Sequence, residues 1–410
     1  MSPRLKTKPA NAETHASSPF SSEAPRRLSI LGATGSIGCT TADVLDAAEG
    51  KFAVEVVAGG SNAEALARIA RRTGARHAVL ADDSRYAEFK ALLSGTGIEV
   101  AAGAQALMEA AVRPVDMVIG AITGAAGVEP TFAAVCAGQT IALANKECLV
   151  CAGAPFMQAA EANAATILPM DSEHNAIFQA MNGKDARAIT KMILTASGGP
   201  FRLSSAAQIA AATPDQALAH PNWDMGPKVT IDSASLMNKG LELIEAHYLF
   251  DVAAEKLGVL VHPQSIVHGL VTYADGAMVA GLALPDMRVP IAHCLGWPSR
   301  IASGTAQLDL AKIAELTFEA PDLERFPALE LATAALQHGG VMPTILNAAN
   351  EVAVELFLKN AVSFPDIARI VDQTCQYFLA RGRIGVPASV SEALAVDHNA
   401  REIVRTSWPA

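Results

Sequence analysis

The chain has 410 residues, of which 51% are apolar and 18% charged, with a formal net charge of −10. This length suffices for two or three domains, each with a sizeable buried core. The negative charge argues against nucleic acid or an anionic membrane surface as the main partner, and no apolar stretch is long enough to span a bilayer.

The six cysteines follow no disulfide framework. Cys148 and Cys151 have the spacing of a redox motif, but no second pair completes a zinc site, so we expect six reduced thiols. Residues 1–26 contain many Ser, Ala and Pro residues and lack the apolar segment of a secretory signal. We expect a disordered tail there; a transit peptide is the alternative, which Glu13 and Glu23 weaken.

The first ordered segment begins near residue 27, where an apolar strand leads into Gly32, Gly35 and Gly38 and then into an amphipathic helix. Glycines at this spacing allow the backbone to close around a pyrophosphate at a helix N-terminus. Glycines also occur in plain strand–helix turns. The strand before them and the helix after them favour a dinucleotide-binding domain.

The next expected strand, residues 52–58, leads into the loop of Gly60, Ser61 and Asn62. In a dinucleotide-binding domain this strand end meets the adenosine ribose, and an acid there favours NAD. The loop has no carboxylate before Glu64, which favours the 2′-phosphorylated cofactor. It also has no arginine nearby in the sequence, so the preference rests on the missing acid alone.

Strand and helix patterns then alternate as far as residue 147. This alternation predicts an α/β fold with a Rossmann-like, doubly wound parallel sheet. Asn145, Lys146 and Glu147 follow the last expected strand of this sheet. They would lie at its C-terminal edge, where such sheets bind ligands.

Two carboxylates follow an apolar run that ends at Met170. In an extended segment Asp171 and Glu173 would lie on the same side, so both could face one point. Ser172 is placed to cap the helix that follows. Two such acids suit a hard divalent cation, although two solvated acids in a turn would give the same pattern.

A later strand ends at Ser197 and is followed by a loop that carries His220, Trp223 and Met225 among Pro, Asn and Gly. One interpretation is a loop held in place by a single buried Trp. The other is a flexible lid whose indole covers a substrate.

The next segment carries Ser233, Asn238, Lys239 and Glu242. Their spacing places Asn238, Lys239 and Glu242 on one helical face, one strand–helix step after Ser233. A surface Lys–Glu pair is the alternative, but apolar neighbours favour a buried site. Glu242 is the third candidate metal ligand, and the Lys, the Asn and the two serines, Ser197 and Ser233, would form a cradle for a phosphate monoester.

Residues 259–284 alternate like antiparallel strands, and we expect His262 and His268 there to be structural. After a linker, helical patterns predict an α-helical domain at the C-terminus.

The motifs G-A-T-G-S-I-G, L-A-N-K-E, M-D-S-E-H-N-A-I-F-Q, A-S-G-G-P-F, H-P-N-W-D-M-G and D-S-A-S-L-M-N-K-G-L-E-L-I-E-A occur in this order. Together they resemble the 1-deoxy-D-xylulose 5-phosphate reductoisomerase family, and the similarity runs from about residue 27 to the C-terminus. The resemblance implies rearrangement and NADPH-dependent reduction of 1-deoxy-D-xylulose 5-phosphate to 2-C-methyl-D-erythritol 4-phosphate, in the non-mevalonate route to isoprenoids. It implies a bacterial, cytoplasmic homodimer that uses Mg²⁺ or Mn²⁺, with Co²⁺ as a further candidate.

The resemblance also implies roles for individual residues. The metal ligands would be Asp171, Glu173 and Glu242, and the catalytic residues would be Lys239, Glu173 and His220. The substrate contacts would be Lys146, Ser172, Glu173, Ser197, His220, Trp223, Ser233, Asn238, Lys239 and Glu242. The cofactor contacts would be Thr34, Gly35, Ser36, Ile37, Gly60, Ser61, Asn62, Asn145, Glu147 and Gly226.

The expected division is a tail (1–26), an NADPH-binding domain (27–150), an α+β catalytic connecting domain with metal site and flap (151–295), a linker (296–325) and a C-terminal α-helical domain (326–410). Two positions depart from the family pattern. Asp224 stands in the flap where a Ser is usual, and the loop at Gly60 lacks the basic residue that some members use.

Two other functions remain open at this point. An NADP-dependent dehydrogenase would share the dinucleotide fold but would not need three acids and a phosphate cradle. A catalytically silent, cofactor-sensing regulator would not need to keep the acids and Lys239.

Overall fold

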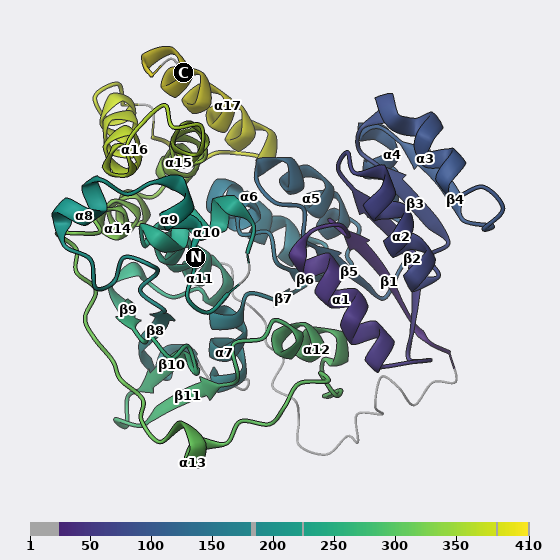
Figure 1. Ribbon diagram of the computed structural model, residues 1–410, viewed down its shortest axis with the longest axis horizontal. Helices are drawn as coiled ribbons and strands as arrows, with labels where there is room; N and C mark the ends of the chain where they lie inside the picture. Colours follow the sequence, from purple (N-terminus) through teal and green to yellow (C-terminus); the bar gives the residue numbers. More distant parts are fainter. Residues whose placement is uncertain (1–23, 182–185, 224, 383, 409–410) are drawn as a thin grey trace. The chain divides into compact units, whose positions relative to one another are not determined.

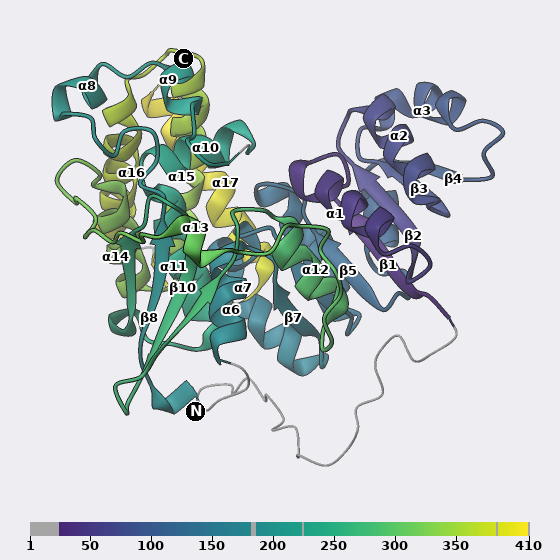
Figure 2. The same cartoon turned by 60° about the horizontal axis from the view of Figure 1, so that its bottom comes forward.

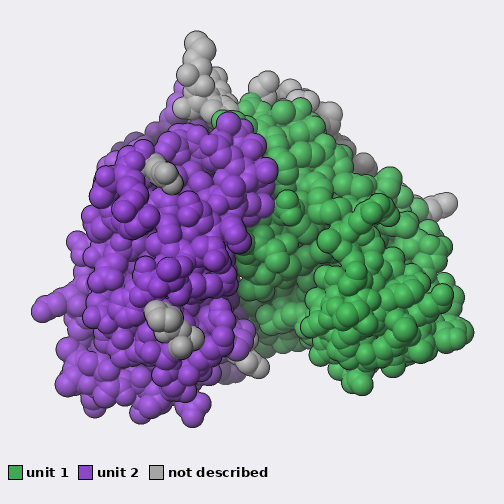
Figure 3. All heavy atoms as spheres, turned by 90° about the horizontal axis from the view of Figure 1, so that it is seen from above, with its two compact units in different colours: residues 1–148, 158–175, 286–306 green, residues 149–157, 176–285, 307–410 purple. Residues whose placement is uncertain are grey.

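The computed structural model describes residues 24–181, 186–223, 225–382 and 384–408. Most of the predicted tail, and Asp224 in the flap, therefore lie outside the described residues. By packing, the chain divides into two compact units, coloured in Figure 3. Unit 1 comprises Met1–Cys148, Gln158–Asn175 and Asp286–Ala306, and unit 2 comprises Leu149–Met157, Ala176–Pro285 and Gln307–Ala410. This division differs from the expected domains, which stay a prediction.

Unit 1 contains a seven-stranded sheet in the order β4-β3-β2-β1-β5-β6-β7, and every neighbouring pair is parallel. The strands are β1 (Arg26–Leu31), β2 (Phe52–Gly59), β3 (His77–Leu80), β4 (Glu99–Ala102), β5 (Met117–Gly120), β6 (Thr140–Leu143) and β7 (Thr166–Pro169). The chain proceeds outward from β1 to β4 and then returns to β5, so the strand order reverses between β1 and β5. This confirms the predicted doubly wound α/β fold and places its ligand-binding crevice at the carboxyl ends of these two strands.

Helices of unit 1 cover this sheet (Figures 1 and 2). They are α1 (Ser36–Ala47), α2 (Ala63–Thr73), α3 (Tyr86–Leu92), α4 (Ala104–Ala111), α5 (Val128–Cys136) and α12 (Arg288–Gly296), with the 3₁₀ turns η1 (Asp83–Arg85) and η2 (Ala125–Gly127). Although α12 comes late in the chain, it packs beside α1 in both views. The Arg26 guanidinium fixes the C-terminal end of α12 by donating hydrogen bonds to the carbonyls of Leu295 (2.8 Å) and Trp297 (3.0 Å).

One expectation for this sheet is wrong. The strand before Asn145 was expected to be the last, but β7 follows α6 (Glu147–Ala162) and pairs in parallel with β6. A four-residue strand that ends in Pro carries too little periodicity to be recognised as a sheet member.

Unit 2 contains a four-stranded sheet in the order β11-β10-β8-β9. Its strands are β8 (Ile189–Ala196), β9 (Leu257–Val261), β10 (Val267–Tyr273) and β11 (Met278–Leu282). The expectation of antiparallel pairing is correct for β10, which runs antiparallel to β8 and β11. It is wrong for β9, which runs parallel to β8, because the helices between these strands form a crossover connection.

The helices between the two parallel strands are α8 (Ala206–Ala210), α9 (Pro214–Leu218), α10 (Pro227–Ala234) and α11 (Met237–Phe250). The sequence before Ser233 was expected to be a strand, but it lies in α10. Pro227 at the first helical position and Gly226 at the N-cap start this helix, and burial of Ile231 stabilises it despite its β-branched residues.

The C-terminal part of unit 2 is helical, as predicted. After the short α13 (Leu310–Ile313) come α14 (Ala328–His338), α15 (Met342–Leu358), α16 (Phe364–Leu379) and α17 (Val390–Ser407). Most residues of α15 are buried, because α14, α16 and α17 all pack against it.

All six cysteines are described and none forms a disulfide, as predicted. Within the described ranges, the helices are too short or too polar to cross a bilayer.

Candidate active site

The glycine loop after β1 is shaped by two close backbone approaches. Gly32 has a φ of +92°, and a Cβ there would lie 2.3 Å from the carbonyl oxygen of Ala121 after β5. A Cβ on Gly38 would lie 2.4 Å from the carbonyl oxygen of Ala33. Because side chains are excluded at these positions, the loop lies directly against the sheet and α1 begins immediately after it. The first N–H groups of α1 have no partner within the helix and suit a pyrophosphate.

Asn145 is buried at the end of β6. Its side-chain amide donates a hydrogen bond to the carbonyl of Gly124 (3.0 Å), contacts the carbonyl of Ile122, and its oxygen accepts the N–H of Cys148 (3.0 Å). Asn145 therefore fixes the loop after β5 and caps the start of α6. The neighbouring Glu147, the first residue of α6, is also buried.

Lys146 and Asp171 form an ion pair in unit 1, with the Lys146 Nζ 3.2 Å from Asp171 Oδ2. Both side chains are largely shielded from solvent. A residue predicted to contact substrate and a predicted metal ligand are thus neighbours at the carboxyl ends of β6 and β7.

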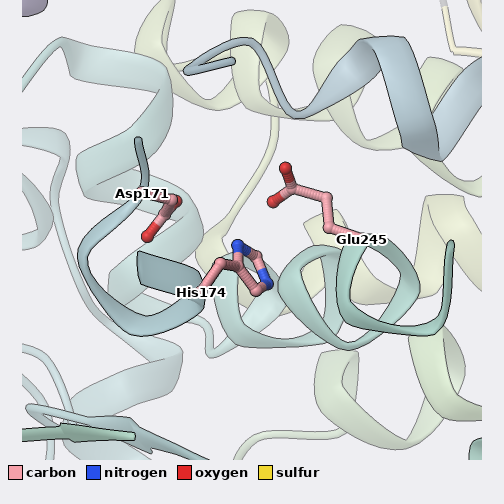
Figure 4. A group of neighbouring side chains, drawn as sticks. All are labelled: Asp171, His174 and Glu245. Carbon is pink, nitrogen blue, oxygen red and sulfur yellow. The ribbon is translucent and has the colours of Figure 1, made fainter. Parts of the chain in front are cut away.

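The turn after β7 differs from the extended segment that was expected. Helix α7 (Ser172–Met181) begins at Ser172, and the Asn175 N–H donates to the Asp171 carbonyl (2.9 Å). Asp171 therefore occupies the N-cap position predicted for Ser172, and Glu173 lies in the first helical turn, where its carboxylate contacts the Ser172 hydroxyl. Figure 4 shows Asp171 and His174 on this turn, and Glu245 on α11 of unit 2.

A buried amide supports this turn. The Asn175 amide donates to the Pro169 carbonyl (2.8 Å) and lies 3.0 Å from His293 Nδ1 on α12. Since the amide nitrogen is a donor, Nδ1 must be an acceptor, and the imidazole is neutral. Burial, and secondarily the charge of Arg300, lowers the pKa of His293 to about 4.

In unit 2, Ser197 and His220 are in contact, with Ser197 Oγ 3.0 Å from His220 Nε2. His220 Nδ1 accepts the backbone N–H groups of Asn222 (3.2 Å) and Trp223 (3.0 Å), so the ring proton is on Nε2 and is donated to Ser197. Burial lowers the pKa of His220 and favours this neutral form. The Ser197 oxygen also accepts the Gly199 N–H (3.2 Å). With both acceptor positions filled, the Ser197 hydroxyl is left to donate its proton to another group.

The loop after β8 also approaches the end of α10. Gly199 has a φ of +66°, and a Cβ there would lie 2.9 Å from the Ser233 carbonyl oxygen. The two serines predicted to bind phosphate therefore come from adjacent backbone segments.

Asn238, Lys239 and Glu242 share one face of α11, as their spacing predicts. The Asn238 amide and the Lys239 ammonium both contact the Glu242 carboxylate, and Lys239 and Glu242 are buried. A buried lysine paired with a buried acid is costly unless it is hydrogen-bonded, which argues against an ordinary surface pair.

A second buried cluster links α10 to α15. Asp232 accepts a hydrogen bond from the Asn350 amide (2.7 Å) and pairs with the Lys228 Nζ (2.9 Å). Asp232 directly precedes Ser233, so this cluster fixes the turn of α10 that carries Ser233.

The predicted flap is held at its base. The Asn222 amide donates to the Pro263 carbonyl and to the Ser265 hydroxyl, both at 2.9 Å. The partly buried Trp223 ring packs edge-on to His268, with centroids 6.3 Å apart.

Three family models match the chain. A model of 1-deoxy-D-xylulose 5-phosphate reductoisomerase matches residues 28–153, and two C-terminal domain models of the same enzyme match residues 167–250 and 282–403. Curated 1-deoxy-D-xylulose 5-phosphate reductoisomerases from Afipia carboxidovorans and Rhodopseudomonas palustris are 56% and 55% identical, each over 94% of both chains. The chain belongs to the 1-deoxy-D-xylulose 5-phosphate reductoisomerase family. This confirms the resemblance seen in the sequence motifs.

Solved structures of the family agree. The Zymomonas mobilis enzyme in complex with NADPH has 45% sequence identity and a TM-score of 0.88, covering 94% of this chain and 100% of its own. A reductoisomerase in complex with NADPH, fosmidomycin and magnesium has 40% identity and a TM-score of 0.87, covering 93% and 98%.

The predicted family residues are divided between the two units. Unit 1 holds the glycine loop, Asn145–Glu147 and the acids Asp171 and Glu173. Unit 2 holds the flap, the phosphate-cradle residues and Glu242, together with Gly226, which caps α10.

Four supporting residues were missed by the sequence analysis: Asn175, Asp232, His293 and Asn350. Asn175 and Asp232 lie within family motifs and could have been found there. His293 and Asn350 lie more than a hundred residues from their partners, and neither belongs to a motif with recognisable chemistry.

Proposed function

We propose that this protein carries out the reaction of its family, the NADPH- and metal-dependent conversion of 1-deoxy-D-xylulose 5-phosphate to 2-C-methyl-D-erythritol 4-phosphate. The observation that carries this proposal is the buried cluster of Asn238, Lys239 and Glu242 on α11. A dehydrogenase that only reduces a carbonyl has no need of it, and a cofactor sensor has no reason to bear its desolvation cost.

The proposed metal ligands are Asp171, Glu173 and Glu242. Their carboxylates fit a hard divalent cation such as Mg²⁺ or Mn²⁺, which prefers oxygen ligands and retains open positions for substrate. Bound there, the cation would polarise the ketone and the adjacent hydroxyl of the substrate, while NADPH supplies the hydride.

The proposed substrate contacts follow from the polar groups of both units. Ser197 donates its hydroxyl proton to the substrate phosphate, since His220 and Gly199 already fill its acceptor positions. Ser233, Asn238 and Lys239 provide further donors, and Trp223 of the flap excludes water. Lys146 and Ser172 adjoin Asp171 and Glu173, so they are placed to contact the sugar hydroxyls.

The proposed catalytic residues are Lys239, Glu173 and His220. Lys239 is a buried cation beside Glu242, where it stabilises negative charge that develops on substrate oxygens. His220 is neutral with its proton on Nε2, so it can orient Ser197 without adding a second positive charge.

The proposed cofactor contacts are the first residues of α1 with Thr34 and Gly35, the loop of Gly60, Ser61 and Asn62, and the three further residues Asn145, Glu147 and Gly226. The exclusion of side chains at Gly32 and Gly38 is the structural feature that supports this assignment. We further propose a cytoplasmic homodimer, as the sequence resemblance implies; gel filtration with light scattering would measure the mass, and a monomer would contradict it.

The test of the reaction is NADPH oxidation with 1-deoxy-D-xylulose 5-phosphate, with and without added Mg²⁺ after chelation. Turnover that depends on both substrate and metal is expected. Absence of turnover in both conditions would exclude the reaction, and metal-independent turnover would exclude the proposed metal site.

The test of the phosphate cradle compares Ser197→Ala and Asn238→Ala with the wild type. Both variants should weaken substrate binding far more than NADPH binding, since each removes a donor to the phosphate. Equal losses for the two ligands would place the phosphate elsewhere.

A further inference from the structure

The loop of Gly60, Ser61 and Asn62 lies beside the glycine loop in unit 1. The N–H groups of Gly32 and Ala33 both donate to the carbonyl of Ala58, at 2.9 and 2.8 Å. A Cβ on Gly59 would meet the Thr34 side chain at 3.2 Å. A ribose attached to a pyrophosphate in the glycine loop would therefore meet residues 60–62.

The sequence of this loop contains no basic residue, but the fold brings one to it. The segment after β3 is joined to the loop by two backbone bonds, from Ala81 N–H to the Gly59 carbonyl (2.8 Å) and from Asp82 N–H to the Gly60 carbonyl (3.3 Å). From the same segment, Arg85 Nη1 donates to the Ser61 carbonyl (2.6 Å). An arginine 24 residues away in sequence thus lies at the loop where the adenosine ribose is expected.

The Arg85 guanidinium is held by a second contact. Its Nε and Nη2 donate to the two carboxylate oxygens of Glu88, at 2.9 and 2.6 Å. A guanidinium has five N–H groups, and these contacts use three of them. One N–H on each terminal nitrogen remains and can be donated to a phosphate oxygen.

The surroundings of Arg85 are acidic. Glu88, by its hydrogen bonds and its charge, and the more distant charges of Asp82 and Glu64 all raise the pKa of Arg85. Without the arginine, these three carboxylates would repel a phosphate group. The N-terminus of α2, which Asn62 caps by accepting the Ala65 N–H (3.0 Å), adds the favourable dipole of a helix.

We propose that Arg85 binds the 2′-phosphate of NADPH and is the residue that gives this chain its preference for NADPH over NADH. The inference rests on the proposed function only in taking NADPH as the cofactor. It resolves the departure from the family pattern at this loop, since the missing basic residue is replaced by one from η1.

The test is a calorimetric titration of the full chain with adenosine 2′,5′-bisphosphate and with 5′-AMP, which differ only in the 2′-phosphate. Arg85→Gln should weaken binding of the bisphosphate by about tenfold or more, the usual effect of losing a charge-assisted contact. Its affinity for 5′-AMP should stay within about twofold, because the Gln amide can still donate to the Ser61 carbonyl. Arg85→Lys should retain part of the preference, since it keeps the charge without the planar pair of donors.

The matched control is Arg76→Gln. It removes the same charge from an exposed arginine that pairs with Glu55. Arg76 directly precedes β3, so it lies at the N-terminal end of this strand, whereas Arg85 follows its C-terminal end. This variant should bind both nucleotides as the wild type does. The difference between wild type and Arg85→Gln should also shrink at high salt, because exposed charges are screened.

Equal weakening of both nucleotides by Arg85→Gln would show that Arg85 only fastens the two loops, and no weakening would place the phosphate elsewhere; either result overturns the inference. The inference would also be overturned if the wild-type chain bound the two nucleotides with equal affinity. None of these results depends on turnover of 1-deoxy-D-xylulose 5-phosphate, which tests the proposed function separately.

Discussion

Glu242 is one of two buried acids on α11, and Glu245 follows it by three residues. Glu242→Gln removes a charge with little change of shape, so we expect normal folding and loss of metal-dependent turnover by about a hundredfold or more. Steady-state rates across a Mg²⁺ titration would measure this. The change also leaves Lys239 beside a neutral amide, so a modest loss of stability is expected.

The comparison variant is Glu245→Gln, which makes the same change one helical turn later. It should keep the metal dependence of the wild type. If Glu245→Gln loses turnover and Glu242→Gln retains it at low metal, the assignment of the third ligand is wrong.

We predict that His293 makes the stability of the folded chain depend on pH. Its pKa of about 4 in the folded chain lies below the ordinary value of 6.5, so the unfolded chain binds more protons between these values. Stability is therefore fully present above about pH 6.5 and falls as the pH decreases toward 4. Because the ring is only partly buried, we expect its contribution to be about 1–3 kcal/mol.

The measurement is urea unfolding at pH 7.5 and pH 5 for the wild type and His293→Gln. The variant should lose less stability than the wild type over this range, since Gln does not titrate. An equal loss in both chains would mean that other groups account for the pH dependence.

At the scale of elements, we predict that a substitution in the flap lowers activity and leaves stability nearly unchanged. Trp223 contacts His268 at one edge and is partly buried. Trp223→Ala should lower turnover and weaken phosphonate hydroxamate inhibitors, because the indole no longer excludes water over the substrate. A melting curve should change little, whereas truncating a core Trp costs about 3–5 kcal/mol. A large fall in melting temperature with activity preserved would show that Trp223 is a core residue.

The link between α10 and α15 predicts that a C-terminal helix influences substrate binding. Asn350→Leu leaves an Asp232 oxygen without its amide donor, at a cost of about 1–3 kcal/mol in stability. Since Asp232 adjoins Ser233, the KM for the sugar phosphate should rise while the Kd for NADPH is unchanged.

Asn347→Leu is the control for this prediction. Asn347 is equally buried on α15, but its amide contacts Glu351 and Cys151 rather than α10. It should lose stability without a change in KM; equal effects of the two variants on KM would contradict the proposed link.

Three of these elements show which structural features could be predicted from local sequence patterns. The strand, glycine loop and helix from β1 to α1 were predicted because each signal is local and the signals agree. The shared face of Asn238 and Glu242 was predicted for the same reason, since helical spacing alone brings them together. The helix α10 was not, because its β-branched residues favour a strand and only its buried position in unit 2 decides otherwise.

At the scale of the whole molecule, the chain contributes to unit 1 in three separate stretches. A fragment of residues 24–150 would lack β7, which pairs with β6, and α12, which packs on α1. We expect this fragment to show no cooperative thermal unfolding by circular dichroism and no NADPH binding. A chain that lacks only residues 1–23 is the control and should behave as the full chain. Cooperative unfolding of the fragment with full affinity would support a domain boundary at residue 150.

The contributions of distant segments explain what the sequence could not reveal. Arg85 meets Ser61, and His293 meets Asn175, only because the sheet of unit 1 brings their segments together. No local pattern marks either residue, since a half-buried arginine and a helical histidine are common. Residues within the motifs were therefore predictable, and positioning residues outside the motifs were not.

The strand order of unit 1 also sets the distance between the glycine loop and Asp171. Three strand spacings separate β1, which carries the glycine loop, from β7, which ends at Asp171. At about 4.8 Å per spacing, backbone pairing alone sets an interval of about 14 Å between them. Gain or loss of one strand would change it by about 5 Å, more than the ~3–3.5 Å at which reacting atoms must be held. Substitutions among the buried apolar side chains of β5 and β6 leave this interval unchanged, whereas an inserted strand would move Asp171 about 5 Å further from the glycine loop.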